Sequence, residues 1–73
     1  KPADAALLKA IDLFTRAYRR MGKDPELTYD LFVCHTLNLN CPKAWEFHDK
    51  VVEMGARTVE DMYLLRLKQY CVR

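Results

Sequence analysis

The chain has 73 residues, of which 51% are hydrophobic and 30% charged, and this balance indicates one globular domain and excludes a disordered segment. Its net charge of +2 is mildly basic, which permits a nucleic-acid partner without indicating one. Three cysteines are an odd count without framework spacing, and no run of about 18 apolar residues occurs. We therefore expect neither a secreted disulfide scaffold nor membrane insertion, and we favour an intracellular, reducing compartment. The first residue is not Met, so a processed chain or an excised segment is expected.

The first expected helix covers residues 4–21. Asp4 is a plausible N-cap, and Gly22 is a natural residue to follow the last turn. Between them, apolar residues recur at spacings of three and four, which predicts a helix with one buried face. These apolar positions are Leu7, Ile11, Phe14, Tyr18 and Met21.

Two further helices are expected over residues 25–38 and 42–54. Each begins with a proline, and a proline is favoured in the first turn of a helix. The helix over 25–38 is apolar on more than one side, so we expect it to be central, and Gly55 ends the helix over 42–54. The expected N-caps are Asp24 for the former and Asn40 or Cys41 for the latter.

The fourth expected helix covers residues 58–71 and opens with a capping box at Thr58. It stays apolar to the end of the chain, which leaves a face that a further repeat or a protein partner would cover. The residues expected to bind that partner are Tyr63, Leu64, Leu67 and Tyr70.

A repeat organises the sequence. The stretch from Ala10 to Ala17, closed by Met-Gly at 21–22, is echoed by the stretch from Ala44 to Val51, closed by Met-Gly at 54–55. The offset is 34 residues at the alanines (positions 10 and 44) and 33 at the methionines (positions 21 and 54). Self-similarity at this period is typical of helix-hairpin repeats.

The segment Leu27-Thr28-Tyr29-Asp30-Leu31, the early Ala44 and the closing Met54-Gly55 resemble a unit of the pentatricopeptide family. The resemblance implies a helical-repeat fold, single-stranded RNA as ligand and a mitochondrion or other organelle as location. Asp30 is the best candidate for the base-reading position, but its equivalent in the next unit falls on Met62 or Tyr63. The spacing of Ala10, Phe14 and Ala17 also resembles the tetratricopeptide family, which implies a peptide of a protein partner instead.

Four side chains form a metal-like cluster: Cys34, His35, Cys41 and His48. Zinc needs four converging ligands, whereas adjacent residues on a helix diverge by about 100°. The same geometry argues against a Cys–His nucleophile pair. We expect no metal, no cofactor and no enzymatic activity, with Cys34 as a small buried hydrophobe.

The densest basic group lies at the end of the first expected helix and comprises Arg16, Arg19, Arg20 and Lys23. Together with Asp30, it is the candidate nucleic-acid surface, and the alternative is a solvated helix face with cations favoured near a helix C-terminus. A looser second group comprises Arg57, Arg66, Lys68 and Arg73. Trp45 is interpreted as a core residue, with a base-stacking platform as the alternative.

We therefore predict an all-α fold of four antiparallel helices, arranged as a helical-hairpin repeat or as a compact four-helix bundle. Residues 1–73 are expected to form one helical domain or a fragment of a longer repeat array. The predicted function is a non-catalytic recognition or scaffolding module for a protein partner. The alternatives are a single-stranded RNA-binding module and a small DNA-binding domain with the fourth helix in the major groove.

Overall fold

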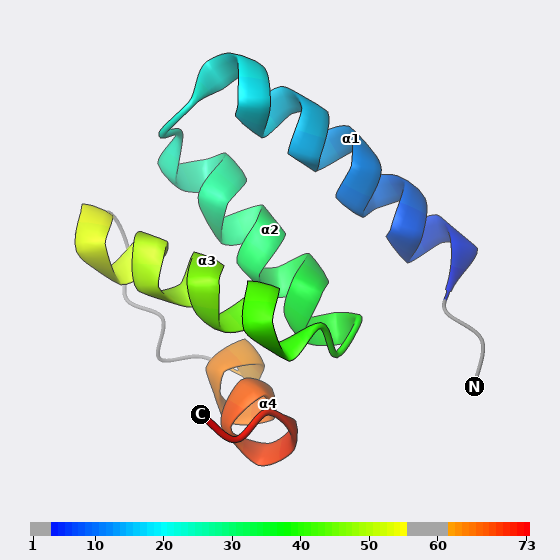
Figure 1. The fold of residues 1–73 in the computed structure, drawn as a ribbon, viewed down its shortest axis with the longest axis vertical. Helices are drawn as coiled ribbons and strands as arrows, with labels where there is room; N and C mark the ends of the chain where they lie inside the picture. The colour runs from blue at the N-terminus through cyan, green and yellow to red at the C-terminus, as the bar shows by residue number, and fades with distance from the viewer. Residues whose placement is uncertain (1–3, 56–61) are drawn as a thin grey trace.

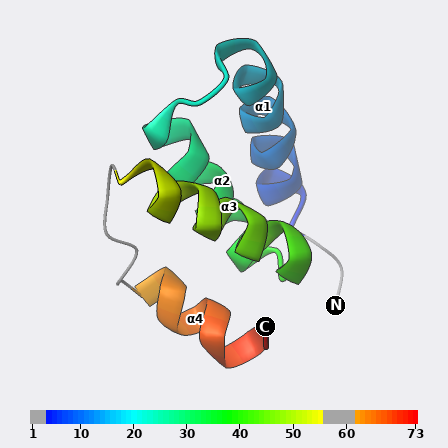
Figure 2. The same cartoon turned by 60° about the vertical axis from the view of Figure 1, so that its left-hand side comes forward.

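The computed structural model describes residues 4–55 and 62–73, and within these ranges the chain forms four α-helices and no strand. The helices are α1 (Ala5–Met21), α2 (Pro25–Leu37), α3 (Cys41–Met54) and α4 (Met62–Tyr70). Consecutive helices run in opposite senses, as Figure 1 shows for α1 to α3 and Figure 2 for α3 and α4. The predicted all-α fold of four antiparallel helices is confirmed; the capping box expected at Thr58 lies outside the described residues.

Side-chain caps start the first three helices. Asp4 accepts hydrogen bonds from backbone N–H groups in the first turn of α1, and Asp24 accepts one of 3.1 Å from the N–H of Leu27. At the start of α3, the side chain of Asn40 accepts the N–H of Lys43, which leaves Cys41 as the first helical residue. Each cap satisfies N–H groups that have no partner inside the helix. The predicted caps at Asp4 and Asp24 are confirmed, and Asn40 is the cap of the two candidates for α3.

Glycines end α1 and α3, as the sequence predicts. Gly22 has φ 71° and ψ −134°, and Gly55 has φ 65° and ψ 12°. Only glycine adopts the first conformation readily, whereas the second is the left-handed helical region that asparagine also visits. The two glycines therefore differ in how strictly the backbone requires them.

α2 is the central helix, as expected, because it contacts α1, α3 and α4. Figure 2 shows α1 and α4 far apart, with α2 and α3 between them. The hydroxyl groups of Thr28 and Thr36 are buried, and they donate to the carbonyl oxygens of Asp24 at 2.7 Å and Phe32 at 2.8 Å. These polar groups are thus satisfied along α2 itself, which allows the helix to be covered on several sides.

The core joins α2, α3 and the C-terminal segment. Its buried members are Leu31, Phe32, Ala44, Phe47, Val51, Leu67 and Cys71. α1 contributes no fully buried residue and packs on this cluster through half-buried side chains. One of these, Tyr18, places its ring edge-on to Phe47 with ring centroids 5.4 Å apart. No helix in the described ranges combines the length and apolar character that a membrane crossing needs.

Candidate functional site

The end of the chain is tied to the start of α3 by a disulfide between Cys41 and Cys71. The bond spans 30 residues of sequence and joins the first residue of α3 to the residue after α4. The spacing of the three cysteines did not predict this bond. The third cysteine, Cys34, has no partner for a disulfide and is a free thiol. It is buried in α2, as expected for a small hydrophobe. Burial, and then the nearby carboxylate of Asp30, raise the pKa of that thiol.

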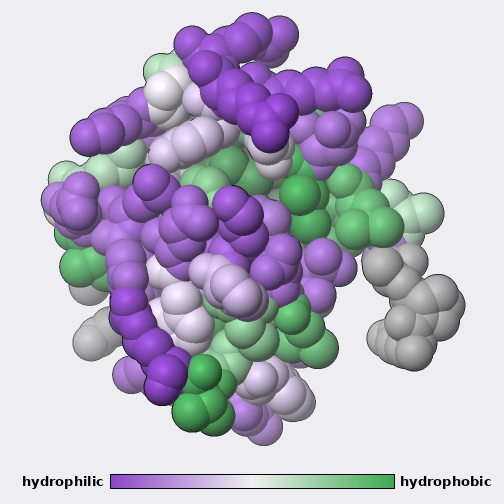
Figure 3. All heavy atoms as spheres, viewed as in Figure 1, coloured by the Kyte–Doolittle hydropathy of each residue, from purple (hydrophilic) through white to green (hydrophobic). Residues whose placement is uncertain are grey.

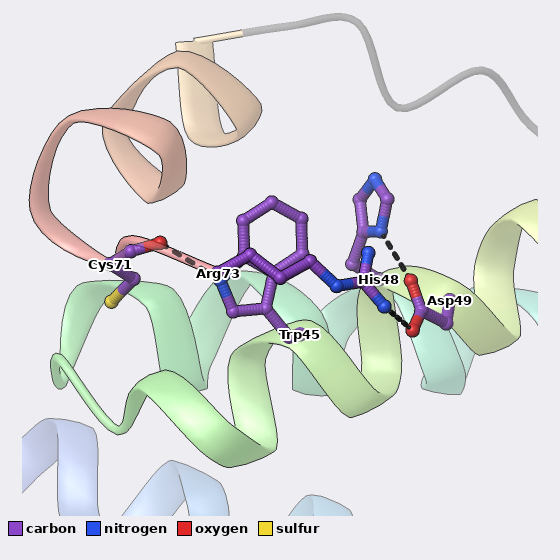
Figure 4. A network of polar contacts seen from close by, with 5 residues as sticks. All are labelled: Trp45, His48, Asp49, Cys71 and Arg73. Atoms are coloured by element: carbon purple, nitrogen blue, oxygen red, sulfur yellow. Dashed lines mark hydrogen bonds and ion pairs between the residues drawn. The ribbon is translucent and has the colours of Figure 1, made fainter.

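Two non-covalent contacts reinforce the disulfide. The indole N–H of Trp45 donates a hydrogen bond of 2.9 Å to the backbone carbonyl of Cys71, and the guanidinium of Arg73 lies 4.7 Å from the centroid of the Trp45 ring (Figure 4). A guanidinium at this distance over an indole is in cation–π range. The core interpretation of Trp45 is thus incomplete, since the ring is half-buried and holds the end of the chain.

Asp49 completes the arrangement. One of its carboxylate oxygens lies 3.0 Å from Nδ1 of His48, and the other pairs with Arg73 (Figure 4). Partial burial acts to raise the pKa of Asp49, but the hydrogen bonds from His48 and Arg73 outweigh it and hold the pKa below its ordinary value. An ionised carboxylate only accepts hydrogen bonds, so Nδ1 of His48 is the protonated nitrogen. We call the set Cys41, Trp45, Asp49, Cys71 and Arg73 the C-terminal clasp.

The structure divides the four predicted partner-binding residues of α4. Leu67 is 0% exposed and belongs to the core, so the prediction that it faces a partner is wrong for this conformation. Tyr63 and Leu64 are half-buried and pack against the same core, while Tyr70 is exposed. The reason is that α4 is apolar on more than one side, and the side bearing Leu67 covers α2 and α3.

The opposite side of α4 carries the exposed apolar residues. Met62 is 69% and Leu65 70% exposed, and they lie three residues apart, so they are neighbours on one helical face. Arg66 and Lys68 are exposed on the same helix. We call Met62, Leu65, Arg66 and Lys68 the outer face of α4; sequence periodicity did not single it out.

The basic group at the end of α1 is exposed. Figure 3 shows hydrophilic side chains gathered in the upper part of the view, where Figure 1 places the α1–α2 turn. Arg16 pairs with Asp12 at 3.1 Å, whereas Arg19 and Arg20 occupy the last turn of α1. Arg57, from the looser basic group, lies outside the described residues. Asp30 is half-buried in α2, beside Cys34.

The structure adds a residue from α3 to this basic region. Lys50 and Lys23 line one shallow pocket of about 320 Å³ together with Tyr18, Glu53 and Met54. The two lysines are far apart in sequence, so their proximity follows only from the packing of α1 and α3 around α2. One carboxylate, from Glu53, shares the pocket and offsets part of the positive charge.

The four residues of the metal-like cluster are not assembled. Cys41 is bonded to Cys71, His48 contacts Asp49, and Cys34 is buried. Among the described residues, no three His, Cys, Asp or Glu side chains are grouped as metal ligands.

His35 occupies an unusual position in the core. It is buried, its ring stacks on Phe47 with centroids 5.6 Å apart, and its Nδ1 has no hydrogen-bond partner within the described part of the chain. Burial, and then the charge of Lys43, lower the pKa of His35, while Glu46 acts weakly in the opposite direction. The folded protein therefore favours the neutral imidazole.

The chain matches no protein-family model, no curated protein sequence and no solved structure.

Proposed function

We propose that this chain is a non-catalytic protein-recognition module that binds an amphipathic helix of a protein partner on the outer face of α4. The observation that carries the proposal is the exposed pair Met62 and Leu65, each about two-thirds accessible although both are large and apolar. Apolar residues on one face of a helix at a spacing of three are the usual anchors of helix-to-helix recognition. Methionine is also enriched at protein interfaces.

The charges beside these anchors define the partner. Arg66 and Lys68 are exposed on the same helix as Leu65. A complementary surface therefore presents apolar side chains with Asp or Glu at its margin, since opposite charges across an interface steer association and fix register. We infer an acidic amphipathic helix as the partner.

A helical-repeat arrangement, which we also propose, would use the same face of α4. In a pentatricopeptide or tetratricopeptide arrangement, α4 opens a second unit, and its outward side packs on the following helix. A module that ends in such a helix has an apolar face ready for a further repeat or for a partner. Its role in a scaffold would follow from the same face.

The test uses a displayed library of amphipathic helical peptides whose flanking residues vary in charge. We expect enrichment of peptides with acidic flanks, and binding lost with Leu65→Glu. Leu13→Glu is the matched control, because Leu13 is an exposed leucine on α1, which lies far from α4. Failure to enrich acidic-flanked peptides, or equal binding by Leu65→Glu and the unchanged chain, would refute the proposal.

A second candidate function, binding of single-stranded RNA, is favoured by the position of Lys50. It adds a cation from α3 to Lys23 and Tyr18 beside the exposed Arg19 and Arg20. Cations that track a phosphate backbone near an aromatic ring are typical of single-strand binding. The test is fluorescence anisotropy of a labelled mixed-sequence RNA at low and physiological salt. Binding at physiological salt that disappears with Arg19→Glu/Arg20→Glu and weakens with Lys50→Glu supports it; flat anisotropy refutes it.

The compartment remains a prediction. Disulfides persist mainly in oxidising compartments, so the Cys41–Cys71 bond weighs against a permanently reducing one. An organelle that supports disulfide formation satisfies both the bond and the location implied by the family resemblance.

A further inference from the structure

We propose that the Cys41–Cys71 disulfide is a site of thiol–disulfide exchange, and that a dithiol reductant acting there releases α4 and the C-terminal clasp from the core. This inference does not depend on the outer face of α4 or on any partner. It rests on the placement of the two sulfurs and on how few other contacts hold α4.

The two cysteines differ in accessibility and in setting. Cys71 is 2% exposed, whereas Cys41 is half-buried, so a reductant reaches the Cys41 side of the bond first. Cys41 is also the first residue of α3, where the helix dipole stabilises a thiolate. A thiolate stabilised in this way is a better leaving group when the mixed disulfide at Cys41 is resolved.

The exchange balances in two steps. A thiolate of the reductant attacks Sγ of Cys41; a new S–S bond forms, the Cys41–Cys71 bond breaks, and its electron pair leaves on Sγ of Cys71, which takes a proton. The second thiolate of the reductant then attacks the first sulfur of the reductant, which is bonded to Cys41 in the mixed disulfide, and Cys41 leaves as a thiolate. The reductant has lost two electrons and become a disulfide, and the protein holds two thiols once the Cys41 thiolate has also taken a proton.

Once the bond is cut, α4 is held by one fully buried side chain, by the half-buried Tyr63 and Leu64, and by the hydrogen bond from Trp45. It is nine residues long, and Leu67 is its one fully buried residue among those described. The ion pair between Arg73 and Asp49 is about half exposed on both sides, and exposed pairs contribute little to stability. The disulfide closes a span of 30 residues, so the detached state gains conformational entropy when the bond is cut.

Detachment uncovers a defined surface. Trp45 loses the carbonyl of Cys71 and the guanidinium of Arg73, and the side of the core that Leu67 covers opens to solvent. The buried cluster to which Leu67 belongs also contains Phe32, Phe47 and Val51. The oxidised chain hides this apolar surface, and the reduced chain presents it.

The experiment follows the single tryptophan during reduction of the full chain by a dithiol. Mass spectrometry after alkylation under native conditions counts the free thiols, and Cys34 serves as an internal control because it is buried. We expect labelling of Cys41 and Cys71 only, a red shift of Trp45 emission, a severalfold rise in its quenching by acrylamide, and most helical circular dichroism retained. The double variant Cys41→Ser/Cys71→Ser should match the reduced chain without reductant and should not respond to it.

Two results would overturn the proposal. If Trp45 emission and quenching stay unchanged after complete reduction, the non-covalent contacts alone hold α4 and the bond controls nothing. If reduction exposes Cys34 and removes most of the helical signal, the bond is a staple of the whole fold instead of a control point for α4.

Discussion

The indole N–H of Trp45 donates to the carbonyl oxygen of Cys71 across 26 residues of sequence, at 2.9 Å. This hydrogen bond acts beside the neighbouring disulfide in fixing the last residues of the chain to α3. Because Trp45 is the only tryptophan, its fluorescence reports on the same place.

Replacing Trp45 by phenylalanine should lower the free energy of unfolding by about 1–2 kcal/mol. The substitution keeps an aromatic ring but removes the donor to Cys71 and weakens the attraction for Arg73. Urea denaturation followed by circular dichroism measures the change. Tyr70→Phe, at an exposed aromatic residue of α4, should stay within about 0.5 kcal/mol of the unchanged chain. Equal effects of the two variants would contradict the clasp.

Leu67→Ala should destabilise the protein by about 2–5 kcal/mol, because it leaves a cavity where the side chain fills the core. Leu65→Ala, two residues away on the opposite side of α4, should change stability by less than about 0.5 kcal/mol. Thermal and urea denaturation of the pair decide which side of α4 is buried. A larger loss for Leu65→Ala would reverse the orientation of the helix.

Stability should fall as the pH drops below about 6.5, because of His35. Burial and then Lys43 lower its pKa from the ordinary value of 6.5, so the unfolded chain binds the proton more tightly than the folded chain. The stabilisation is present above pH 6.5 and is lost as the pH falls toward the folded-state pKa. His35→Leu should flatten the stability profile in this window, measured by urea denaturation at a series of pH values.

Titration of Asp49 changes the stability in a separate and more acidic pH range, so an Asp49 variant serves as a control for His35. Its pKa is held below the ordinary value of 3.8, so its contribution is present above that pH and is lost only as the pH falls further. Asp49→Asn should therefore leave the window below pH 6.5 unchanged. If the Asp49 variant flattens that window and His35→Leu does not, the assignment to His35 is wrong.

The two helix-ending glycines should tolerate substitution differently. At Gly55 the left-handed helical conformation costs an alanine about 1 kcal/mol, and asparagine should be tolerated better. At Gly22 the combination of φ 71° and ψ −134° is accessible almost only to glycine, so alanine and asparagine should both cost more. Differential scanning calorimetry of the four variants tests this order, and a lower melting temperature for Gly55→Asn than for Gly22→Asn would contradict it.

Sequence predicted best where the local signal was strong. In α1 the apolar stripe identified Leu7, Ile11, Phe14 and Tyr18 as inward residues, and all four are half-buried, whereas Met21, the last member of the stripe, is 62% exposed. Helical spacing also places Asp12 one turn before Arg16, and the two side chains pair at 3.1 Å. Both follow from helical spacing alone, since residues three and four apart share a face whatever the rest of the fold does.

The sequence pattern does not predict which side of α4 is buried. Met62, Tyr63, Leu64, Leu65 and Leu67 place apolar groups all around the helix, so periodicity selects no face. Packing against α2 and α3 buries Leu67 and leaves Leu65 exposed.

The disulfide was missed for a related reason. Three cysteines admit three pairings, and although Cys34 was expected to be buried, only the folded chain shows that Cys41 and Cys71 lie within bonding distance. One signal was available: Cys41 begins the third expected helix and Cys71 ends the fourth. In antiparallel neighbours, the start of one helix and the end of the next lie at the same end of the pair.

Thr28 and Thr36 donate their hydroxyl groups to the carbonyl oxygens one turn earlier, so these two side chains need no partner on the helices around α2. Its backbone amides can exchange with solvent deuterium only when those neighbours have left. Native-state exchange should therefore proceed from the outside inward, at α1 and α4 before α2. On this view the chain is a protected central helix with a latch at one end, and its slowest amides report global unfolding.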